Sequence, residues 1–174
     1  MANYKLLVIS GSLRKDSLNT KLARAFIARA PEGVTMELAD ISTIPLYNGD
    51  EEAAHFPEVV VSLKDKIKES DGIVLITPEY NRSMPGVLKN VLDYTSRPYG
   101  DSAWTGKPVF VAGATGGPIG TALAQYDAKK VLLYVGAHPL PQPELNGRIA
   151  ESAAWVLFWL RERGDIHRRR HTLP

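Results

Sequence analysis

The 174-residue sequence predicts an α/β fold, a doubly wound parallel sheet of five strands in the order 2-1-3-4-5 with helices on both faces. Short apolar runs alternate along the chain with segments of helical periodicity, which is typical of strand–helix–strand units. Two of the runs, 73–77 (IVLIT) and 108–112 (PVFVA), have the continuous apolar character of strands buried on both faces. Because five strands alternate with five helices, we expect a parallel sheet that helices cover on both faces.

The other expected strands are also short, and their signals differ in strength. The run 35–40 (TMELAD) alternates apolar and polar residues, as a half-buried strand does. Asp71 and Gly72 form a turn that leads into the central strand. The last of the five strands has the weakest signal. The strands are expected at 5–9, 35–40, 73–77, 108–112 and 137–140.

The helices are recognised from their apolar spacing and from the residues at their ends. The first places Leu22 and Phe26 on one side and ends at Pro31. Pro57 suits the first turn of the second helix. The stretch 41–55 contains several turn-forming residues, so we expect it to be a loop. The helices are expected at 18–30, 57–70, 87–96, 121–135 and 149–163.

Composition is that of a globular protein, since 44% of the residues are hydrophobic and 23% are charged. The apolar runs are too short to span a bilayer, so no membrane insertion is expected. Residues 161–174 carry a charge of +3, which leaves −1 for residues 1–160 and no broad basic face for nucleic acid. We expect one domain over 1–163 and a basic, flexible tail over 164–174. The sequence has no cysteine, and no signal peptide is recognised, so we expect a cytoplasmic protein.

The loop after the first strand, residues 10–20 (SGSLRKDSLNT), is suited to binding a phosphate. The first N–H groups of a helix have no partner within the helix, and the helix dipole adds positive charge there. Ser12, Ser17 and Asn19 can donate further hydrogen bonds, and Arg14 can supply a full charge. The same polar side chains could instead serve only to cap the helix.

Two more elaborate loops, 78–86 and the glycine-rich 113–120, follow strands three and four. In the expected strand order these loops meet the first loop at the carboxyl edge of the sheet. The GxxxxGK[ST], GxGxxG and GxSxG patterns are absent, and the acidic cluster of a phosphorylation receiver is missing after the first strand. With these classes of site excluded, the remaining possibility is a ligand that has a single phosphate at the first loop and a larger flat group lying across the other two loops. FMN fits that description.

Two motifs in these loops resemble those of one family. Gly11-Ser12-Leu13-Arg14, with Ser17 and Asn19, resembles the GSLRxxSxN loop of the NADPH-dependent FMN reductase family. The segment 78–97 (PEYNRSMPGVLKNVLDYTSR) resembles the PEYNxSxPGxLKNAIDWxSR segment of the same family almost position by position. The resemblance covers about residues 4–147 and is closest to the quinone, chromate and azo-dye reductase branch, which has a flavodoxin-like fold.

The resemblance implies a set of site residues. The FMN phosphate is expected at Ser12, Arg14, Ser17, Leu18 and Asn19. The isoalloxazine ring is expected beside Pro78, Glu79, Tyr80, Asn81 and Ser83. The third loop is expected to close over the ring with Ala114, Thr115, Gly116 and Gly117. No side chain is expected to act as an acid or base, Glu79 is expected to be structural, and no metal is expected.

The implied activity is an NAD(P)H-dependent FMN or quinone reductase, in which NADPH or NADH gives a hydride to FMN and an acceptor then collects it. Quinones, azo and nitro compounds, chromate and free flavin are possible acceptors. A flavodoxin-like electron carrier and a flavin-binding sensor are alternatives that share the fold. Such a carrier is usually strongly acidic, whereas residues 1–160 of this chain are near neutral. Oxidation of NAD(P)H by the purified protein with its yellow FMN bound would distinguish the enzyme from both alternatives.

Two positions depart from the family pattern. Members are homodimers that often pair into tetramers, through a network involving residues that match Tyr126 and Glu144. This chain has Leu123 where relatives place an arginine of that network, so dimer and tetramer both stay open. Arg82 occupies the variable position of PEYNxS and adds positive charge beside the expected flavin. It is either an exposed charge or a partner for the extra phosphate of NADPH or for a neighbouring subunit.

Overall fold

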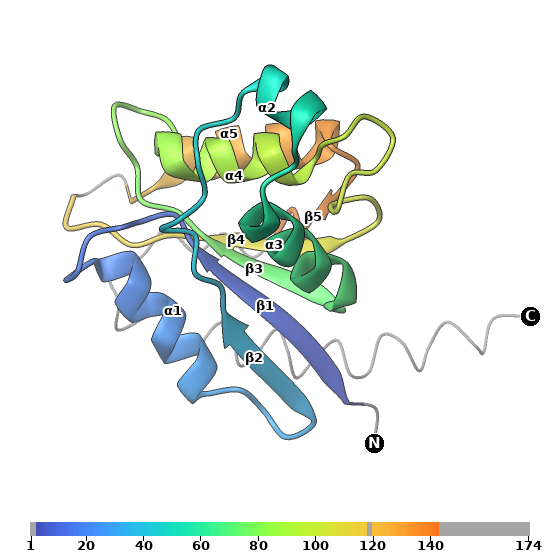
Figure 1. Ribbon diagram of the computed structural model, residues 1–174. Helices are drawn as coiled ribbons and strands as arrows, with labels where there is room; N and C mark the ends of the chain where they lie inside the picture. Colours follow the sequence, from blue (N-terminus) through green and yellow to red (C-terminus); the bar gives the residue numbers. More distant parts are fainter. Residues whose placement is uncertain (1–2, 118–119, 143–174) are drawn as a thin grey trace, which may run out of the picture.

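The computed structural model describes residues 3–117 and 120–142. Within these ranges five parallel strands form one sheet in the order β2-β1-β3-β4-β5, which confirms the predicted topology (Figure 1). The elements in chain order are β1 (Tyr4–Ser10), α1 (Leu18–Ala28), β2 (Val34–Leu38), α2 (Gly49–Ala54), α3 (Glu58–Glu69), β3 (Gly72–Ile76), α4 (Gly86–Thr95), β4 (Pro108–Ala112), α5 (Ala122–Tyr134) and β5 (His138–Pro139).

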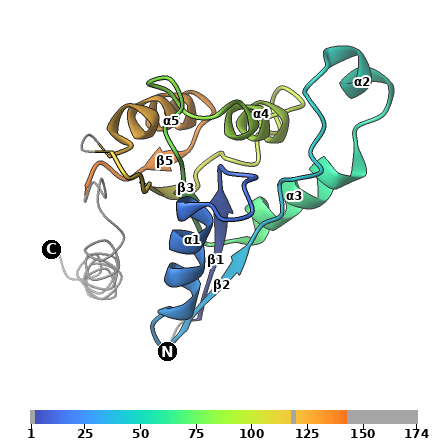
Figure 2. The same cartoon turned by 90° about the vertical axis from the view of Figure 1, so that its left-hand side faces the viewer.

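The sheet separates two apolar cores. Val8 of β1 packs in one core with Leu22 and Phe26 of α1. Its neighbours Leu7 and Ile9 lie in the other core, which is lined by α3, α4 and α5. This division follows from the strand geometry, because successive side chains point to opposite faces. Figure 2 shows the strands running between α1 on one side and α4 and α5 on the other.

The central strand β3 is buried along its whole length, as its apolar sequence predicts. It pairs with β1 on one side, where Ser10 lies opposite Ile76, and with β4 on the other, where Ile76 lies opposite Ala112. The carboxyl ends of these three strands therefore lie next to one another. The loops that follow them begin from a single rigid edge.

The expectation of a continuous loop over 41–55 was wrong in one part, because Gly49–Ala54 forms α2. Asn48 caps this helix by accepting a hydrogen bond from the Asp50 N–H at 3.0 Å. Acidic residues in the first turn add a favourable interaction with the helix dipole. None of the six residues of α2 is buried, so no apolar periodicity marks the helix in the sequence.

Other boundaries differ by a few residues from those expected. The second strand is Val34–Leu38, and the last is reduced to His138–Pro139. The expected helix 149–163 and the basic tail 164–174 lie outside the described residues. Among the helices of the described part, none has the length and apolar character needed to cross a membrane.

Candidate active site

The first loop joins β1 to the N-terminus of α1 at the carboxyl edge. Gly11 donates its N–H to the Ile76 carbonyl at 2.7 Å, which extends the pairing of β1 with β3. A Cβ at Gly11 would lie only 3.0 Å from Leu88 Cδ2, so the close approach of α4 favours glycine here. The backbone then turns outward, and residues 13–16 are exposed.

Ser17 is the N-cap of α1. Its Oγ accepts hydrogen bonds from the N–H groups of Asn19 at 3.1 Å and Thr20 at 3.3 Å. The capping interpretation of this serine is therefore realised in the structure. The hydroxyl proton of Ser17 is not used in these two bonds, so the residue can still donate to an anion that binds at the start of the helix.

Asn19 has partners other than a phosphate. Its Nδ2 donates to the Ala114 carbonyl at 2.9 Å, and its Oδ1 accepts from the Ala114 N–H at 2.9 Å. Both residues are buried, and the side-chain amide of Asn19 thus completes the backbone of the third loop. A direct contact between Asn19 and a phosphate stays a prediction. What the structure adds is that Asn19 joins two of the three predicted loops.

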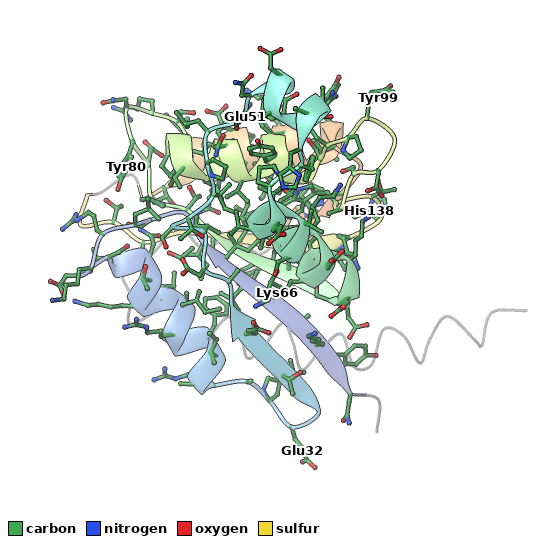
Figure 3. The ribbon with its side chains drawn as sticks, in the orientation of Figure 1. Glu32, Glu51, Lys66, Tyr80, Tyr99 and His138 are labelled. Atoms are coloured by element: carbon green, nitrogen blue, oxygen red, sulfur yellow. The ribbon has the colours of Figure 1, made fainter. Side chains whose placement is uncertain are left out.

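The second loop contains a tight turn at residues 80–83. Tyr80 and Ser83 exchange both backbone hydrogen bonds, at 2.9 and 3.1 Å. The two central residues, Asn81 and Arg82, have φ angles of +52° and +68°. Asparagine tolerates this left-handed region, whereas for most L-residues it costs about 1–2 kcal/mol. Tyr80 is 47% exposed and stands on this turn at one end of α4, far from Tyr99 at the other end (Figure 3).

Glu79 and Ser83 attach the second loop to α5. Glu79 Oε2 accepts from the N–H groups of Leu123 at 3.0 Å and Ala124 at 3.2 Å, so it caps a helix that has no cap of its own. A structural role for Glu79 was predicted, and this geometry provides one. Ser83 donates its hydroxyl to Asp127 Oδ2 at 2.6 Å.

The charge of Asp127 is stabilised by its surroundings. The hydrogen bond from Ser83, and after it the hydrogen bond from Lys130, hold the pKa of Asp127 below its usual value. Asp127 therefore stays ionised at neutral pH, and Ser83 must act as the donor in their hydrogen bond. Arg14 in the first loop and Arg82 in the second loop, by contrast, are exposed. The site accordingly offers positive charge to an anionic ligand.

The third loop begins with a residue that has no room for a side chain. A Cβ on Gly113 would lie 2.0 Å from Thr121 Oγ1 and 2.3 Å from the Thr77 carbonyl oxygen. Ala114 is buried, Thr115 Oγ1 accepts from the Gly117 N–H at 3.2 Å, and Gly116 and Gly117 are exposed. A Cβ on Gly116 would meet no atom within 4 Å, which leaves open space beside the loop.

Three structural residues were not predicted from the sequence, and two of them lie at this site. Gly113 and Asp127 bring the second loop, the third loop and α5 together. Asn90, within the family-like LKN sequence, holds the segment before α2: its Nδ2 donates to the Pro45 carbonyl at 2.7 Å and its Oδ1 accepts from the Tyr47 N–H at 2.8 Å. The recurrence of Asn90 in the motif was the available signal, but a structural role cannot be read from a motif alone.

The donor set at this edge fits FMN. A helix N-terminus, the hydroxyls of Ser12 and Ser17 and the exposed Arg14 suit a terminal phosphate. The exposed Tyr80 and the open space at Gly116 suit a planar ring. No group of three or more potential metal ligands occurs within residues 3–117 and 120–142. A sheet of this order with such a loop after its first strand defines the class of flavodoxin-like flavoproteins.

Comparisons with known proteins give the family. The model of the NADPH-dependent FMN reductase family matches residues 4–151. A 2-hydroxy-1,4-benzoquinone reductase from a Burkholderia species is 47% identical over 148 residues, covering 85% of this chain and 80% of the relative. An NAD(P)H-dependent FMN reductase of Pseudomonas aeruginosa is 45% identical over 151 residues, covering 87% and 81%. The chain belongs to the NADPH-dependent FMN reductase family.

A solved structure supports the same assignment. The flavoenzyme FerB of Paracoccus denitrificans, an NAD(P)H:(acceptor) oxidoreductase, is 46% identical and superposes with a TM-score of 0.79. The match covers 83% of this chain and 79% of FerB. The protein is therefore an oxidoreductase with FMN as its cofactor and NAD(P)H as its electron donor.

Proposed function

We propose that this protein is an NAD(P)H:quinone oxidoreductase that carries FMN at the carboxyl edge of β1, β3 and β4. The observation that supports the proposal is that three loops meet there: the start of α1, which is suited to an anion, the turn that carries the exposed Tyr80, and the exposed glycine loop. Relatives named as quinone reductases in Burkholderia and Pseudomonas putida support the choice of acceptor. Quinones need little specific binding beyond a flat apolar surface. Azo and nitro compounds, chromate and free flavin are the other acceptors that the kinetic experiment below compares with quinones.

The phosphate of FMN is assigned to the first loop. Arg14 supplies the charge, and Ser12 and Ser17 supply hydroxyl donors, beside the positive end of the α1 dipole. The backbone of Leu18 and Asn19 forms the first turn of that helix. The Asn19 side chain acts indirectly, because it fixes the third loop through Ala114.

The isoalloxazine ring is assigned to the second and third loops. The main chain at Pro78, Glu79 and Asn81 borders the ring, Tyr80 offers an aromatic face, and Ser83 fixes the turn. Ala114, Thr115, Gly116 and Gly117 close over it, since glycine lets the backbone come close. Bound FMN would supply the chemistry of hydride transfer between NAD(P)H and the acceptor. These residues would orient the ring, and no side chain needs to move a proton.

We also propose that the protein is a cytoplasmic homodimer. Leu123 and Tyr126 on α5 are 41% and 68% exposed, and Leu133 and Tyr134 are 64% and 89% exposed. Such a row of exposed apolar side chains favours association with a partner surface. Leu123 removes a charged contact on which tetramers of the family depend, so the dimer is the expected assembly. Sedimentation at several protein concentrations tests this assignment.

Steady-state kinetics with the purified protein test the proposed function. We expect a yellow protein that binds FMN and oxidises NADPH or NADH when a benzoquinone is added. Rates with azo dye, nitro compound, chromate and free FMN, measured under the same conditions, rank the acceptors. Bound FMN without turnover would favour an electron carrier or a sensor. Absence of FMN binding would refute the site assignment.

A further inference from the structure

The turn at residues 80–83 holds a conformation that its sequence does not favour. Asn81 and Arg82 both lie in the left-handed region, and neither is glycine. A two-residue turn with two positive φ angles is most often built from Asn-Gly. Arginine at the second position is held there against its intrinsic preference, so other contacts must stabilise the turn.

Two contacts flank the turn, and both connect it to α5. Glu79, just before the turn, accepts from Leu123 and Ala124 in the first turn of the helix. Ser83, its last residue, donates to Asp127 at 2.6 Å. Residues 123 and 127 are one helical turn apart and lie on the same face of α5. The loop is thereby fastened on both sides of Asn81 and Arg82.

Of these two contacts, the hydrogen bond between Ser83 and Asp127 is the better candidate for fixing the turn. It is short, one partner is charged, and it joins side chains 44 residues apart. The other partner of Asp127, Lys130, lies on the same helix with a side chain that is 73% exposed. An exposed ion pair between neighbours on one helix contributes little to stability. Asp127 therefore acts on the structure mainly through its hydrogen bond with Ser83.

We propose that Asp127 is a positioning residue: through Ser83 it holds the left-handed turn and so fixes Tyr80 and Arg82 beside the flavin. The inference rests on the proposed function only in that the turn borders FMN. Asp127 itself does not touch the reacting atoms. Its loss is expected to release the turn toward conformations that arginine prefers, and to disorder the ring-binding surface without disrupting either apolar core.

Cleavage by trypsin after Arg82 measures the turn directly in the FMN-free protein, because a protease requires a locally opened chain. We expect cleavage at Arg82 to be about 10-fold faster in Asp127→Ala and Ser83→Ala than in the wild type, relative to cleavage after Arg29. Asp127→Asn keeps an acceptor for Ser83 and is expected to restore most of the protection. Lys130→Ala, the matched control, keeps the Ser83 bond and should stay within about twofold of wild type.

A double-mutant cycle with Arg82→Gly separates positioning from general stability. Glycine adopts a φ of +68° without strain, so in its presence Asp127 has less to hold. We expect Asp127→Ala to weaken FMN binding about 10-fold in the wild-type background and less than about threefold in the Arg82→Gly background. The visible circular dichroism of bound FMN should change in Asp127→Ala and return toward the wild-type spectrum in Asp127→Asn.

Equal cleavage at Arg82 in wild type and Asp127→Ala would overturn the proposal, as would an equal loss of FMN affinity in both backgrounds. If Asp127→Ala does not fold, Asp127→Asn and Ser83→Ala decide the question with the same readouts. A wild-type protein that binds no FMN would refute the proposed function instead. The cleavage rates of the FMN-free protein would still decide whether Asp127 holds the turn.

Discussion

The side-chain amide of Asn19 pairs with the backbone of Ala114 through two hydrogen bonds of 2.9 Å, one in each direction. An amide side chain thereby takes the place of a neighbouring strand for one residue of the third loop. The pair joins the start of α1 to the end of β4, two regions 95 residues apart. Its burial makes it both a stabilising contact and the element that aligns two of the proposed cofactor loops.

Asn19→Ala should lower the free energy of unfolding by about 2–4 kcal/mol, because it leaves the buried N–H and C=O of Ala114 without partners. Urea unfolding monitored by circular dichroism measures the change. Asn48→Ala is the comparison, since it removes a cap from the exposed α2 and should cost no more than about 1 kcal/mol. A loss as small as that of Asn48→Ala would show that water replaces the Asn19 amide.

Arg14→Ala should weaken FMN binding about 10- to 100-fold, because a charge-assisted bond to phosphate is lost. Fluorescence titration of the FMN-free protein gives the dissociation constant. Lys15→Ala removes a neighbouring exposed charge of the same sign and serves as the control. If both variants lose affinity equally, the loop attracts the phosphate only by its overall charge.

Gly113→Ala should destabilise the fold by about 2–3 kcal/mol, since the new methyl group would overlap Thr121 Oγ1 and the Thr77 carbonyl oxygen. Thermal and urea unfolding test this expectation. Gly116→Ala, three residues further on, enters open space and should change stability by no more than about 0.5 kcal/mol. Similar losses in the two variants would contradict the packing at Gly113.

Arg82→Ala should raise the KM for NADPH about 3- to 10-fold while leaving that for NADH nearly unchanged, if Arg82 meets the additional phosphate of NADPH. The readout is the ratio of kcat/KM for the two donors with one quinone at fixed concentration. An unchanged ratio would remove this role and leave Arg82 as an exposed charge.

Asp101 gives the fold a defined sensitivity to acid. The hydrogen bond from Lys68, followed by that from Lys64, lowers the pKa of Asp101 to about 2 from its usual 3.8. Because the folded-state pKa is the lower one, the stabilisation is fully present above about pH 4 and is lost as the pH falls toward 2. Asp101→Asn should show a smaller decrease of unfolding free energy between about pH 5 and pH 2 than wild type. It should also be less stable at neutral pH, where the buried Lys64 loses its carboxylate partner. Identical pH profiles would show that other acids dominate.

The fold could be predicted because its signals are local. The apolar runs at β3 and β4 and the amphipathic pattern of α1 are visible in single segments, and the crossover rule then limits the possible strand orders. Helix α2 was missed because it buries no side chain and so has no apolar periodicity, although Asn48 followed by three acidic residues was a usable capping signal.

The site could be predicted only in part. The first two loops were identified from motifs, and the capping alternative for Ser17 was recognised from its residue type. The contacts of Asn19 with Ala114, of Glu79 with α5 and of Ser83 with Asp127 depend on which distant segments meet. No single stretch of sequence contains that information. The same holds for Gly113, whose constraint comes from Thr77 and Thr121.

The pairing of Asn19 with Ala114 also bears on when the site forms during folding. The loop it closes spans 95 residues, so it cannot form until β1, β3 and β4 are assembled in one sheet. A cofactor that requires both the α1 terminus and the third loop therefore binds the completed native state and not its precursors. Added FMN should consequently slow unfolding while leaving the rate of refolding almost unchanged. The cofactor would thus lengthen the lifetime of the folded state without directing how the chain folds.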